Sequence, residues 1–590
     1  MKVLVIGSGI AGLTAAIRSA ELGCSVVMVS PYVSERAQSV MAAGGINAVL
    51  DDTGEYDSVD IHVEDTIRAG VFLESEDSVR GLCEAAPDIV RWLDSIGVIF
   101  SRTGDGKIAQ RAFGGQSRDR TCYAGASTGK QIVTALTRKC REYEISGRIE
   151  RRTGLHFHSA LIRGGRAYGA VFTDDVTEEA VPVFADAVIM ASGGMNALFG
   201  KTTGSELCDG YAASMLMTEG AKLRNLEFIQ YHPTTIETAN KRMLVSEAAR
   251  GEGGRLYYEE HGKRVYFMED RYGEYGNLMP RDIVSRCIYN CPSQVYLDVS
   301  FLGKEVIHDR LEEVEELCDQ YLGIDICRES IPVSPSVHFF MGGIKVDDCH
   351  ETDIQALFAA GECASKYHGA NRLGGNSLLA AVYSGETAAK TAVDKYGDEA
   401  GSADAGEPDF TGRIEEIKSE IAELKESSGS SGKEVPVTAV KKCLAKIMNQ
   451  DLGIVRDAEG LKRGIAETES MIRDVKKYGV SRDFSLYERY RVYHMLLLAE
   501  AILMSAFVRE ESRGAHHRVD FPETKEEYRK DTIAEFRDGM LHIRFEPVEK
   551  DSAESDSGSD DNAWSDSGTD VNAGNSSGTG DDSEKGGGAE

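Results

Sequence analysis

The chain contains 590 residues, of which 41% are hydrophobic, and its formal net charge is −31. This length allows about three or four domains, and the apolar content is enough for a large core. Residues 551–590 hold eleven acidic residues and one lysine, so the rest of the chain still has a net charge of −21. A chain this acidic is an unfavourable partner for nucleic acid, and we expect no nucleic-acid binding.

The first thirty residues follow the pattern of a β-α-β unit: an apolar run, a glycine turn, an amphipathic stretch and a second apolar run. The turn is Gly7-Ser8-Gly9-Ile10-Ala11-Gly12. Its glycines allow a pyrophosphate to approach the N-terminus of the following helix. Ser30 ends the second apolar run, where an NAD-binding fold usually has an acidic residue, and this argues against NAD.

The rest of the chain divides by composition. Short alternating apolar runs between about 155 and 195 predict further strands. Gly, Ser, Asp and Glu dominate residues 398–435 outside one charged helix at 414–425, which predicts a linker. Residues 436–515 show the helical periodicity typical of a small bundle.

Two further segments indicate whether the chain crosses a membrane and whether its end is folded. The apolar stretch 493–508 is interrupted by His494 and Glu500, so it is too short and too polar to cross a bilayer, and we predict no membrane span. Residues 551–590 are Ser/Gly/Asp repeats with almost no apolar side chains. Such a segment cannot offset the entropy of ordering, so we expect a disordered acidic tail without a catalytic role.

Twelve cysteines are scattered along the chain without a C-x-x-C pair, and the closest two are Cys287 and Cys291. Zinc and iron–sulfur sites need grouped thiolates, so we predict no metal site. We interpret the cysteines as reduced thiols of a cytoplasmic protein, since secreted chains of this size seldom carry so many unpatterned cysteines. Any iron–sulfur relay is therefore expected on another chain.

Nine motifs in a fixed order carry a family resemblance. They are AAGGI at 42–46, FGGQ at 113–116, ASGG at 191–194, EFIQYHPT at 227–234, SEAARGEGG at 246–254, PRD at 280–282, HFFMGG at 338–343, HGANRLGGNSL at 368–378 and ESRGAH at 511–516. Together they resemble the flavoprotein subunit of the succinate dehydrogenase and fumarate reductase family, from residue 1 to about 525. The resemblance implies an FAD-dependent oxidoreductase that acts on CH–CH bonds.

The resemblance also implies an architecture of class α/β. We expect a Rossmann-like FAD-binding domain that is split in sequence, an inserted α+β capping domain, a helical bundle domain and the disordered acidic tail. The expected ranges are 1–230 and 345–395 for the FAD domain, 231–344 for the cap, 396–435 for the linker, 436–525 for the helical domain, 526–550 for a small C-terminal extension and 551–590 for the tail. The implied flavin contacts are Gly7, Gly9, Ala11, Gly12, Ser30, Gly44, Gly45, Asp209, Glu362, Ser377 and Leu378.

Fumarate is a planar dianion, and hydride delivery to it develops negative charge on one carboxylate side, so cationic and hydrogen-bonding groups must surround it. The motifs offer Phe113, His232, Ser246, His338 and Arg372 as substrate-binding residues. Arginine holds a carboxylate through two parallel hydrogen bonds. By resemblance, Arg281 donates the proton to the second alkene carbon and is reloaded through Glu247 and Arg250.

Membrane-bound members of the family carry a histidine covalently joined to FAD, and Gln38 stands at that place here. A glutamine amide cannot form the bond, so the FAD is expected to be noncovalent. The covalent link raises the flavin potential and favours succinate oxidation. Its loss therefore favours fumarate reduction over the reverse reaction.

Three alternatives stay open. L-Aspartate oxidase, a sister family, has a glutamate where this chain has Phe113; a carboxylate there pairs with the substrate ammonium, and a phenyl ring cannot. The second alternative is a reductase of another activated alkene, and the third is a non-catalytic FAD electron-transfer protein. The expected partners are a small dicarboxylate and a separate iron–sulfur subunit or a diffusible electron donor, with any membrane association peripheral and through partner subunits.

Overall fold

The computed structural model describes residues 1–50, 57–125, 127–239, 241–398, 408–426 and 434–548. The tail expected at 551–590 lies outside the described residues, as does part of the expected linker. The described residues belong to a single compact unit.

The N-terminal motif builds the centre of a parallel five-stranded sheet of order β19-β10-β1-β2-β6. Val3 and Val5 pack on one face of this sheet, and Leu4 and Ile6 on the other. Because both faces are covered, the inner strands β1, β2 and β10 are nearly continuous apolar runs, whereas the edge strand β6 is mostly polar and only partly buried. The strands are β1 (Lys2–Ile6), β2 (Ser25–Ser30), β6 (Ile149–Thr153), β10 (Ala187–Met190) and β19 (Leu357–Ala359).

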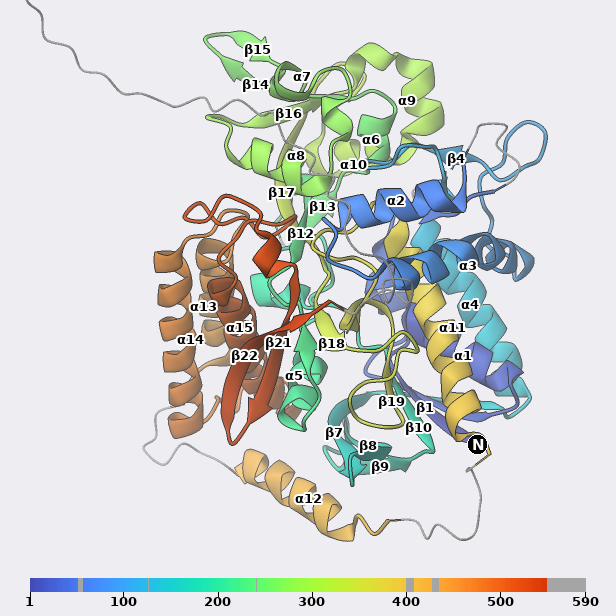
Figure 1. The fold of residues 1–590 in the computed structure, drawn as a ribbon, viewed down its shortest axis with the longest axis vertical. Helices are drawn as coiled ribbons and strands as arrows, with labels where there is room; N and C mark the ends of the chain where they lie inside the picture. Colours follow the sequence, from blue (N-terminus) through green and yellow to red (C-terminus); the bar gives the residue numbers. More distant parts are fainter. Residues whose placement is uncertain (51–56, 126, 240, 399–407, 427–433, 549–590) are drawn as a thin grey trace, which may run out of the picture. The chain divides into compact units, whose positions relative to one another are not determined.

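Helices cover one face of this sheet (Figure 1). They are α1 (Ile10–Glu21), α3 (Glu76–Ser95), α4 (Thr128–Ile145) and α11 (Asn376–Tyr396), with α2 (Val59–Ala69) beside α3. On the other face lie α5 (Tyr211–Thr218) and an antiparallel sheet of β7 (Leu155–Arg163), β8 (Arg166–Asp174) and β9 (Ala180–Phe184). The charged helix expected at 414–425 is present as α12 (Thr411–Glu426), and it packs against β9.

A small sheet of β3 (Ile46–Asn47), β5 (Thr121–Cys122) and β4 (Gln110–Arg111) lies near α11.

An antiparallel sheet of order β13-β12-β17-β16-β14-β15 has its own apolar cluster. The strands are β12 (Ile229–Glu237), β13 (Arg242–Leu244), β14 (Arg255–Glu260), β15 (Lys263–Val265), β16 (Val295–Asp298) and β17 (Ile331–Phe340). Its helices are α6 (Ala248–Gly251), α7 (Phe267–Tyr272), α8 (Arg281–Tyr289), α9 (Lys304–Arg310) and α10 (Glu312–Leu322). These elements lie in the range expected for the cap, whose boundaries stay a prediction.

Three helices, α13 (Val437–Asp451), α14 (Ala458–Tyr478) and α15 (Leu486–Val508), lie side by side where the bundle is expected (Figure 1). Asp457 and Ser485 cap α14 and α15 by accepting backbone N–H bonds. Helix α15 is longer than the apolar stretch 493–508, and by length and composition alone it is able to cross a membrane. However, 72% of its most apolar window is buried inside the protein, which is typical of a core helix.

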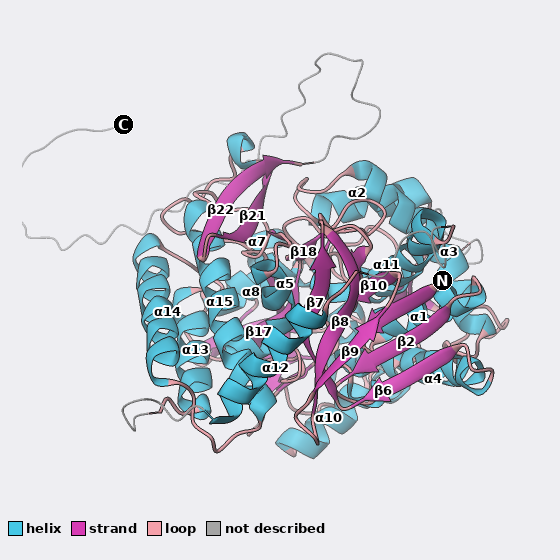
Figure 2. Ribbon diagram, turned by 90° about the horizontal axis from the view of Figure 1, so that it is seen from below, coloured by secondary structure: helices cyan, strands magenta, loops and turns pink. Residues whose placement is uncertain are grey.

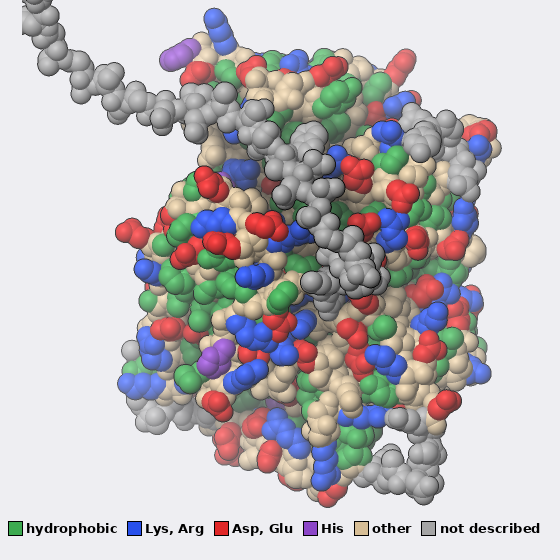
Figure 3. Space-filling view, viewed as in Figure 1, with side chains coloured by type: hydrophobic (Ala, Val, Ile, Leu, Met, Phe, Trp, Pro, Cys, Tyr) green, Lys and Arg blue, Asp and Glu red, His purple; other side chains and the backbone are tan. Residues whose placement is uncertain are grey.

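Residues 530–547 form a hairpin of β21 (Lys530–Arg537) and β22 (Met540–Pro547). Strand β21 pairs with β11 (Leu223–Arg224), in a sheet that also contains β18 (Gly343–Lys345) and β20 (Ala364–Ser365) (Figure 2). The segment expected as a small extension is therefore an integral part of a sheet. On the visible face of the molecule, basic and acidic side chains are interspersed (Figure 3).

Candidate flavin and dicarboxylate site

A cavity of about 490 Å³ brings together most of the residues that the sequence singled out. The turn after β1, the end of β2, strands β12 and β17 and the start of α11 all contribute to its wall. The predicted residues that line it are Gly7, Gly9, Ala11, Ser30, Gly44, Gly45, Phe113, Asp209, His232, Ser246, Glu247, Arg281, His338, Glu362, Arg372, Ser377 and Leu378. Gly12 and Arg250 do not line the cavity. Gly12 packs against Gly7, and Arg250 bonds to Glu247 from behind the cavity wall.

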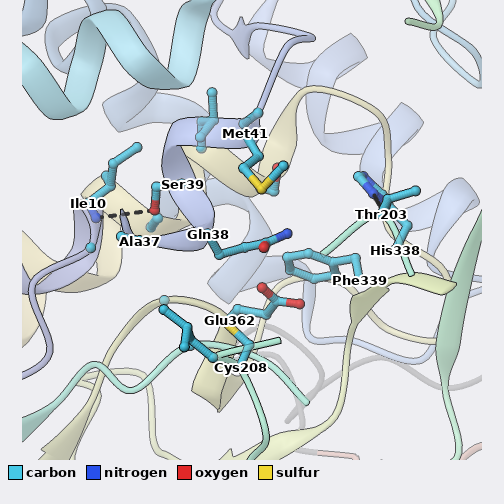
Figure 4. A pocket seen from close by; sticks show the side chains of 18 of the residues that line it. Ile10, Ala37, Gln38, Ser39, Met41, Thr203, Cys208, His338, Phe339 and Glu362 are labelled. Atoms are coloured by element: carbon cyan, nitrogen blue, oxygen red, sulfur yellow. Dashed lines mark hydrogen bonds between the residues drawn. The ribbon is translucent and has the colours of Figure 1, made fainter. Parts of the chain in front are cut away.

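The glycine turn has a conformation that larger residues cannot adopt. Gly7 has a φ of +122°, and a Cβ atom on it would lie 2.1 Å from the carbonyl oxygen of Ala191. A Cβ atom on Gly12 would lie 2.1 Å from the carbonyl oxygen of Gly7, so Gly12 allows the helix to pack against the turn. The N-terminus of α1 thus faces the cavity, and the backbone N–H of Ile10 is bonded to Ser39 Oγ at 3.3 Å (Figure 4). This cradle fits a dinucleotide pyrophosphate.

Two polar side chains, Gln38 and Glu362, point into the same part of the cavity (Figure 4). Gln38 Oε1 accepts a hydrogen bond from the backbone N–H of Ser205, which fixes the direction of its amide. Glu362 Oε1 accepts one from the N–H of Phe340 at 3.2 Å. Burial raises the pKa of the Glu362 carboxyl to about 7. Both groups therefore offer a hydrogen bond to a polar ligand in the cavity without adding a full negative charge below pH 7.

A buried carboxylate, Glu247, joins two buried arginines. Its Oε2 accepts hydrogen bonds from Arg281 Nη2 at 2.6 Å and Nε at 3.0 Å, and its Oε1 accepts one from Arg250 Nη2 at 2.7 Å. Burial alone would raise the pKa of Glu247, but Arg281 and Arg250 outweigh it and lower the pKa. The trio therefore carries one net positive charge, and Glu247 connects Arg281 at the cavity wall to Arg250 behind it.

Gln230, which the sequence analysis did not select, holds the two cavity arginines together. Its Oε1 accepts hydrogen bonds from Arg281 Nη1 at 3.1 Å and from Arg372 Nη2 at 3.0 Å. Its Nε2 donates to the carbonyl oxygen of Arg372 at 2.7 Å. Gln230 and His232 are two residues apart on β12, so they point to the same face of the sheet. This period-two relation to a predicted site histidine is the sequence signal that identifies Gln230.

Arg372 differs from Arg281 and Arg250 in that it forms no ion pair with a carboxylate among the described residues. Burial and then Arg281 lower its pKa well below the usual range. Its Nε has no hydrogen-bond partner among the described residues, and its guanidinium carbon lies 4.4 Å from the centre of the Phe339 ring. An unpaired, buried N–H group at a cavity wall is costly unless a ligand accepts from it. Arg372 is therefore prepared for an anionic ligand.

Two histidines from adjacent strands, His232 on β12 and His338 on β17, have ring centres 5.3 Å apart. His232 Nδ1 bonds to the carbonyl oxygen of Thr234 at 3.0 Å, and His338 Nδ1 to Thr203 Oγ1 at 2.8 Å. His232 Nδ1 also lies 3.3 Å from the backbone N of Thr234, so the backbone of Thr234 fixes the orientation of the ring. Burial, followed by the charge of Arg281, lowers both pKa values well below the ordinary value. Both rings are therefore neutral at pH 7 when no anion lies beside them.

Phe113 and Ser246 complete the wall. Phe113 is buried, and a Cβ atom on Gly44 would lie 2.9 Å from its Cζ. The Phe113 ring thus packs against the glycine pair of the AAGGI motif. Ser246 Oγ accepts a hydrogen bond from the N–H of Ala248 at 3.3 Å. The hydroxyl proton of Ser246 is therefore free to be donated to a ligand.

Known proteins resemble the chain over nearly its full length. A family model described as FAD binding domain matches residues 2–378, and one described as fumarate reductase flavoprotein C-term matches 441–557. The succinate dehydrogenase flavoprotein subunit of Bacillus subtilis is 38% identical over 90% of this chain and 93% of its own. A chain of the CoM/CoB fumarate reductase of Methanothermobacter marburgensis is 35% identical over 90% of this chain and 96% of its own.

Among solved structures, an E. coli quinol fumarate reductase flavoprotein superposes with a TM-score of 0.85. It is 29% identical, and the match covers 94% of this chain and 97% of that one. These relatives confirm FAD as the cofactor and an α/β fold with an FAD-binding part followed by a helical part. The chain is an FAD-dependent oxidoreductase and belongs to the succinate dehydrogenase and fumarate reductase flavoprotein family.

Proposed function

We propose that this chain reduces fumarate to succinate with noncovalent FAD. The observation that carries the proposal is the cationic wall made by Arg372, Arg281 and the Glu247–Arg250 pair, inside the cavity that also holds the dinucleotide turn. Bound FAD supplies the hydride that adds to one alkene carbon. The chain's own residues bind the dianion, orient it and deliver one proton to the other carbon.

Substrate binding rests on charge and on hydrogen-bond geometry. Arg372 holds one carboxylate through two parallel hydrogen bonds, using the Nε–H that lacks a partner among the described residues. The second carboxylate lies near His232 and His338. Its negative charge raises the pKa of both rings and so favours their protonated form. Ser246 adds a hydroxyl donor. This arrangement fixes a planar dicarboxylate in one orientation.

Arg281 is the proposed proton donor. A free arginine is a weak acid, so transfer requires that the lost proton is replaced at once. Glu247 bonds to Arg281 and Arg250 through different oxygens, which makes it a relay between the cavity and the residue behind the wall. A proton that passes from Arg250 through Glu247 restores Arg281, and one proton taken up from solvent restores Arg250. Both arginines then carry the same charge before and after the reaction.

Gln38 supports the proposed direction and the free flavin. Its amide faces the cavity and its Oε1 is bonded to Ser205, so the side chain has a structural role and no chemistry for a covalent bond. A noncovalent flavin lacks the rise in potential that favours succinate oxidation. We therefore infer that reduction of fumarate is the favoured direction.

The electrons for FAD must come from outside this chain. Its twelve cysteines, which all lie within the described residues, are free thiols and do not form a cluster site. Several relatives are named as subunits, which supports electron donation by a separate iron–sulfur protein; a diffusible donor is the other route. We place the enzyme in the cytoplasm, peripheral to the membrane if its partner is membrane-bound.

The test is an assay of the purified chain with a reduced viologen dye as electron donor. Without oxygen, we expect dye oxidation with fumarate and none above background with an aryl acrylate. In a separate assay with oxygen and no dye, we expect no hydrogen peroxide from L-aspartate. Turnover of aspartate would identify an L-aspartate oxidase, and turnover of the acrylate alone would identify a different alkene reductase. A yellow protein that turns over none of the three substrates would be a non-catalytic electron-transfer protein, and the proposal would be wrong.

A further inference from the structure

The cavity has a second end, far in sequence from the dicarboxylate residues. Ser30, Leu155 and Phe157 line it there, beside Asp209. In dinucleotide folds the ribose of the adenosine half lies at the end of the second strand, which Ser30 occupies here. Strand β6 pairs with β2 up to Ser30, and Leu155 follows β6 directly. This end is therefore the adenosine end of the cavity.

One residue of the helical region, Tyr487 on α15, also lines this cavity. Its ring stacks on the ring of His156, with centres 3.4 Å apart and planes 28° apart. It also meets the ring of Tyr211 edge-on at 5.4 Å. The guanidinium carbon of Arg491 lies 4.7 Å from the centre of the same ring. These three neighbours fix the orientation of the ring, and Tyr487 contributes to the wall of the flavin cavity and to that of a smaller cavity beside Tyr490.

Arg491, one turn further along α15, holds the hydroxyl group of Tyr487 and the carboxylate of Asp209 in place. Its Nη1 donates to Asp209 Oδ2 at 2.8 Å and to the hydroxyl oxygen of Tyr487 at 3.1 Å. The hydroxyl of Tyr487 therefore accepts one bond and keeps its own proton to donate. Asp209 and Tyr487 both face the cavity, so Arg491 sets the position of two wall residues from behind.

We propose that Tyr487 binds the adenosine half of FAD, as a ring wall with a hydroxyl donor, and that Arg491 is its positioning residue. Helix α15 then closes the end of a cavity whose other walls come from the Rossmann-like part and the cap-range strands. FAD retention consequently depends on the helical region, which is remote in sequence from the glycine turn. This inference concerns flavin binding and does not depend on which alkene is reduced.

The fold supplies a matched control. Tyr490, on the same helix, stacks on His158 of the same strand β7, with centres 4.2 Å apart and planes 12° apart. This second Tyr–His pair has the same chemistry, but Tyr490 does not line the flavin cavity. A loss of general packing affects both pairs, whereas a loss of adenosine binding affects the first pair alone.

The experiment uses the full-length holoprotein with the substitutions Tyr487→Leu, Tyr487→Phe and Tyr490→Leu. FAD release on dilution is followed by flavin fluorescence, and ADP and FMN are tested as competitors of FAD rebinding. We expect Tyr487→Leu to raise the Kd for FAD and for ADP about tenfold, as is typical when a stacking ring is removed. Tyr487→Phe should raise both about threefold, while FMN binding and the Tyr490→Leu variant should stay close to wild type.

Either of two kinds of outcome would overturn the proposal. One is an unchanged Kd for FAD and ADP in both Tyr487 variants. The other is equal weakening of FAD, ADP and FMN, or equal weakening by Tyr490→Leu, because either result indicates loosened packing rather than a lost adenosine contact. Since Tyr487→Phe keeps the buried ring, it remains informative if Tyr487→Leu does not fold. Failure of the fumarate assay would leave these binding results unaffected.

Discussion

The two ends of the cavity are built on different physical grounds. At the dicarboxylate end, Arg281, Arg372, Glu247 and Gln230 form one connected set of buried hydrogen bonds with an excess of positive charge. At the adenosine end, stacked rings surround Arg491, which forms ion pairs with Asp209 and Glu488. In the proposed function, the first end undergoes a change of charge during the reaction, and the second holds a group that does not react. Substitutions at the first should therefore change turnover, and those at the second should change retention of the flavin.

The largest expected effect is that of Arg281→Lys. Lysine keeps the charge but cannot make both bonds to Glu247 and the bond to Gln230, so the proton path loses its geometry. We expect fumarate turnover to fall by about 10³-fold, within the range for loss of general acid catalysis. Flavin content and thermal stability, measured on the same preparation, should stay within error.

Arg310→Lys is the control for this change, since Arg310 is an exposed cap-range arginine that pairs with Glu252. It should retain wild-type turnover. A wild-type rate in Arg281→Lys would remove Arg281 from the role of proton donor.

A second change, Gln230→Leu, tests whether the arginines act as a positioned pair. Without the Oε1 acceptor, Arg281 and Arg372 repel each other with no group between them. We expect kcat/KM for fumarate to fall by about 10²-fold, the cost of a displacement near 1 Å at a reacting centre. A merely structural role would lower thermal stability and leave the kinetics of the folded fraction unchanged.

The histidine pair gives a pH-dependent prediction of moderate size. The pKa values of His232 and His338 are low when no anion is bound, so a bound dianion that raises them must bring protons in from solvent. We expect dicarboxylate affinity to fall by up to about tenfold per pH unit for each ring that takes up a proton, as pH rises toward the raised pKa values. Calorimetry of malonate binding in two buffers with different ionisation enthalpies measures the uptake.

His338→Gln should reduce the number of protons taken up on binding, because one of the two titrating rings is removed. An identical binding enthalpy in both buffers, with wild-type protein, would show that no proton is taken up. That result would mean that the arginines alone balance the charge of the dianion.

The contrast between the two ends also explains what the sequence could reveal. The glycine turn, the charged helix at 414–425 and the bundle were predicted correctly because each depends on local periodicity or on backbone conformation. The dicarboxylate residues lie within motifs, and the structure brings them to one cavity. Gln230 was missed because its role is to accept from two arginines that are distant in sequence. Tyr487 was missed because only the tertiary packing of α15 carries it to the cavity, and the pairing of β21 with β11 was missed for the same reason.

The smallest expected effect sits between the two ends, at Gln38. Acid precipitation of the wild-type protein should release all of the yellow colour into the supernatant, and colour that stays in the pellet would contradict the noncovalent assignment. Gln38→Ala removes the side-chain amide from the cavity wall, and with it one hydrogen bond to the bound flavin, a loss of about 1 kcal/mol that corresponds to about fivefold. We expect that change in the Kd for FAD by fluorescence, together with an equal change for FMN. A raised Kd for both FMN and FAD places Gln38 at the flavin ring. A raised Kd for ADP places Tyr487 at the adenosine. The two measurements together therefore separate the two ends of the cavity.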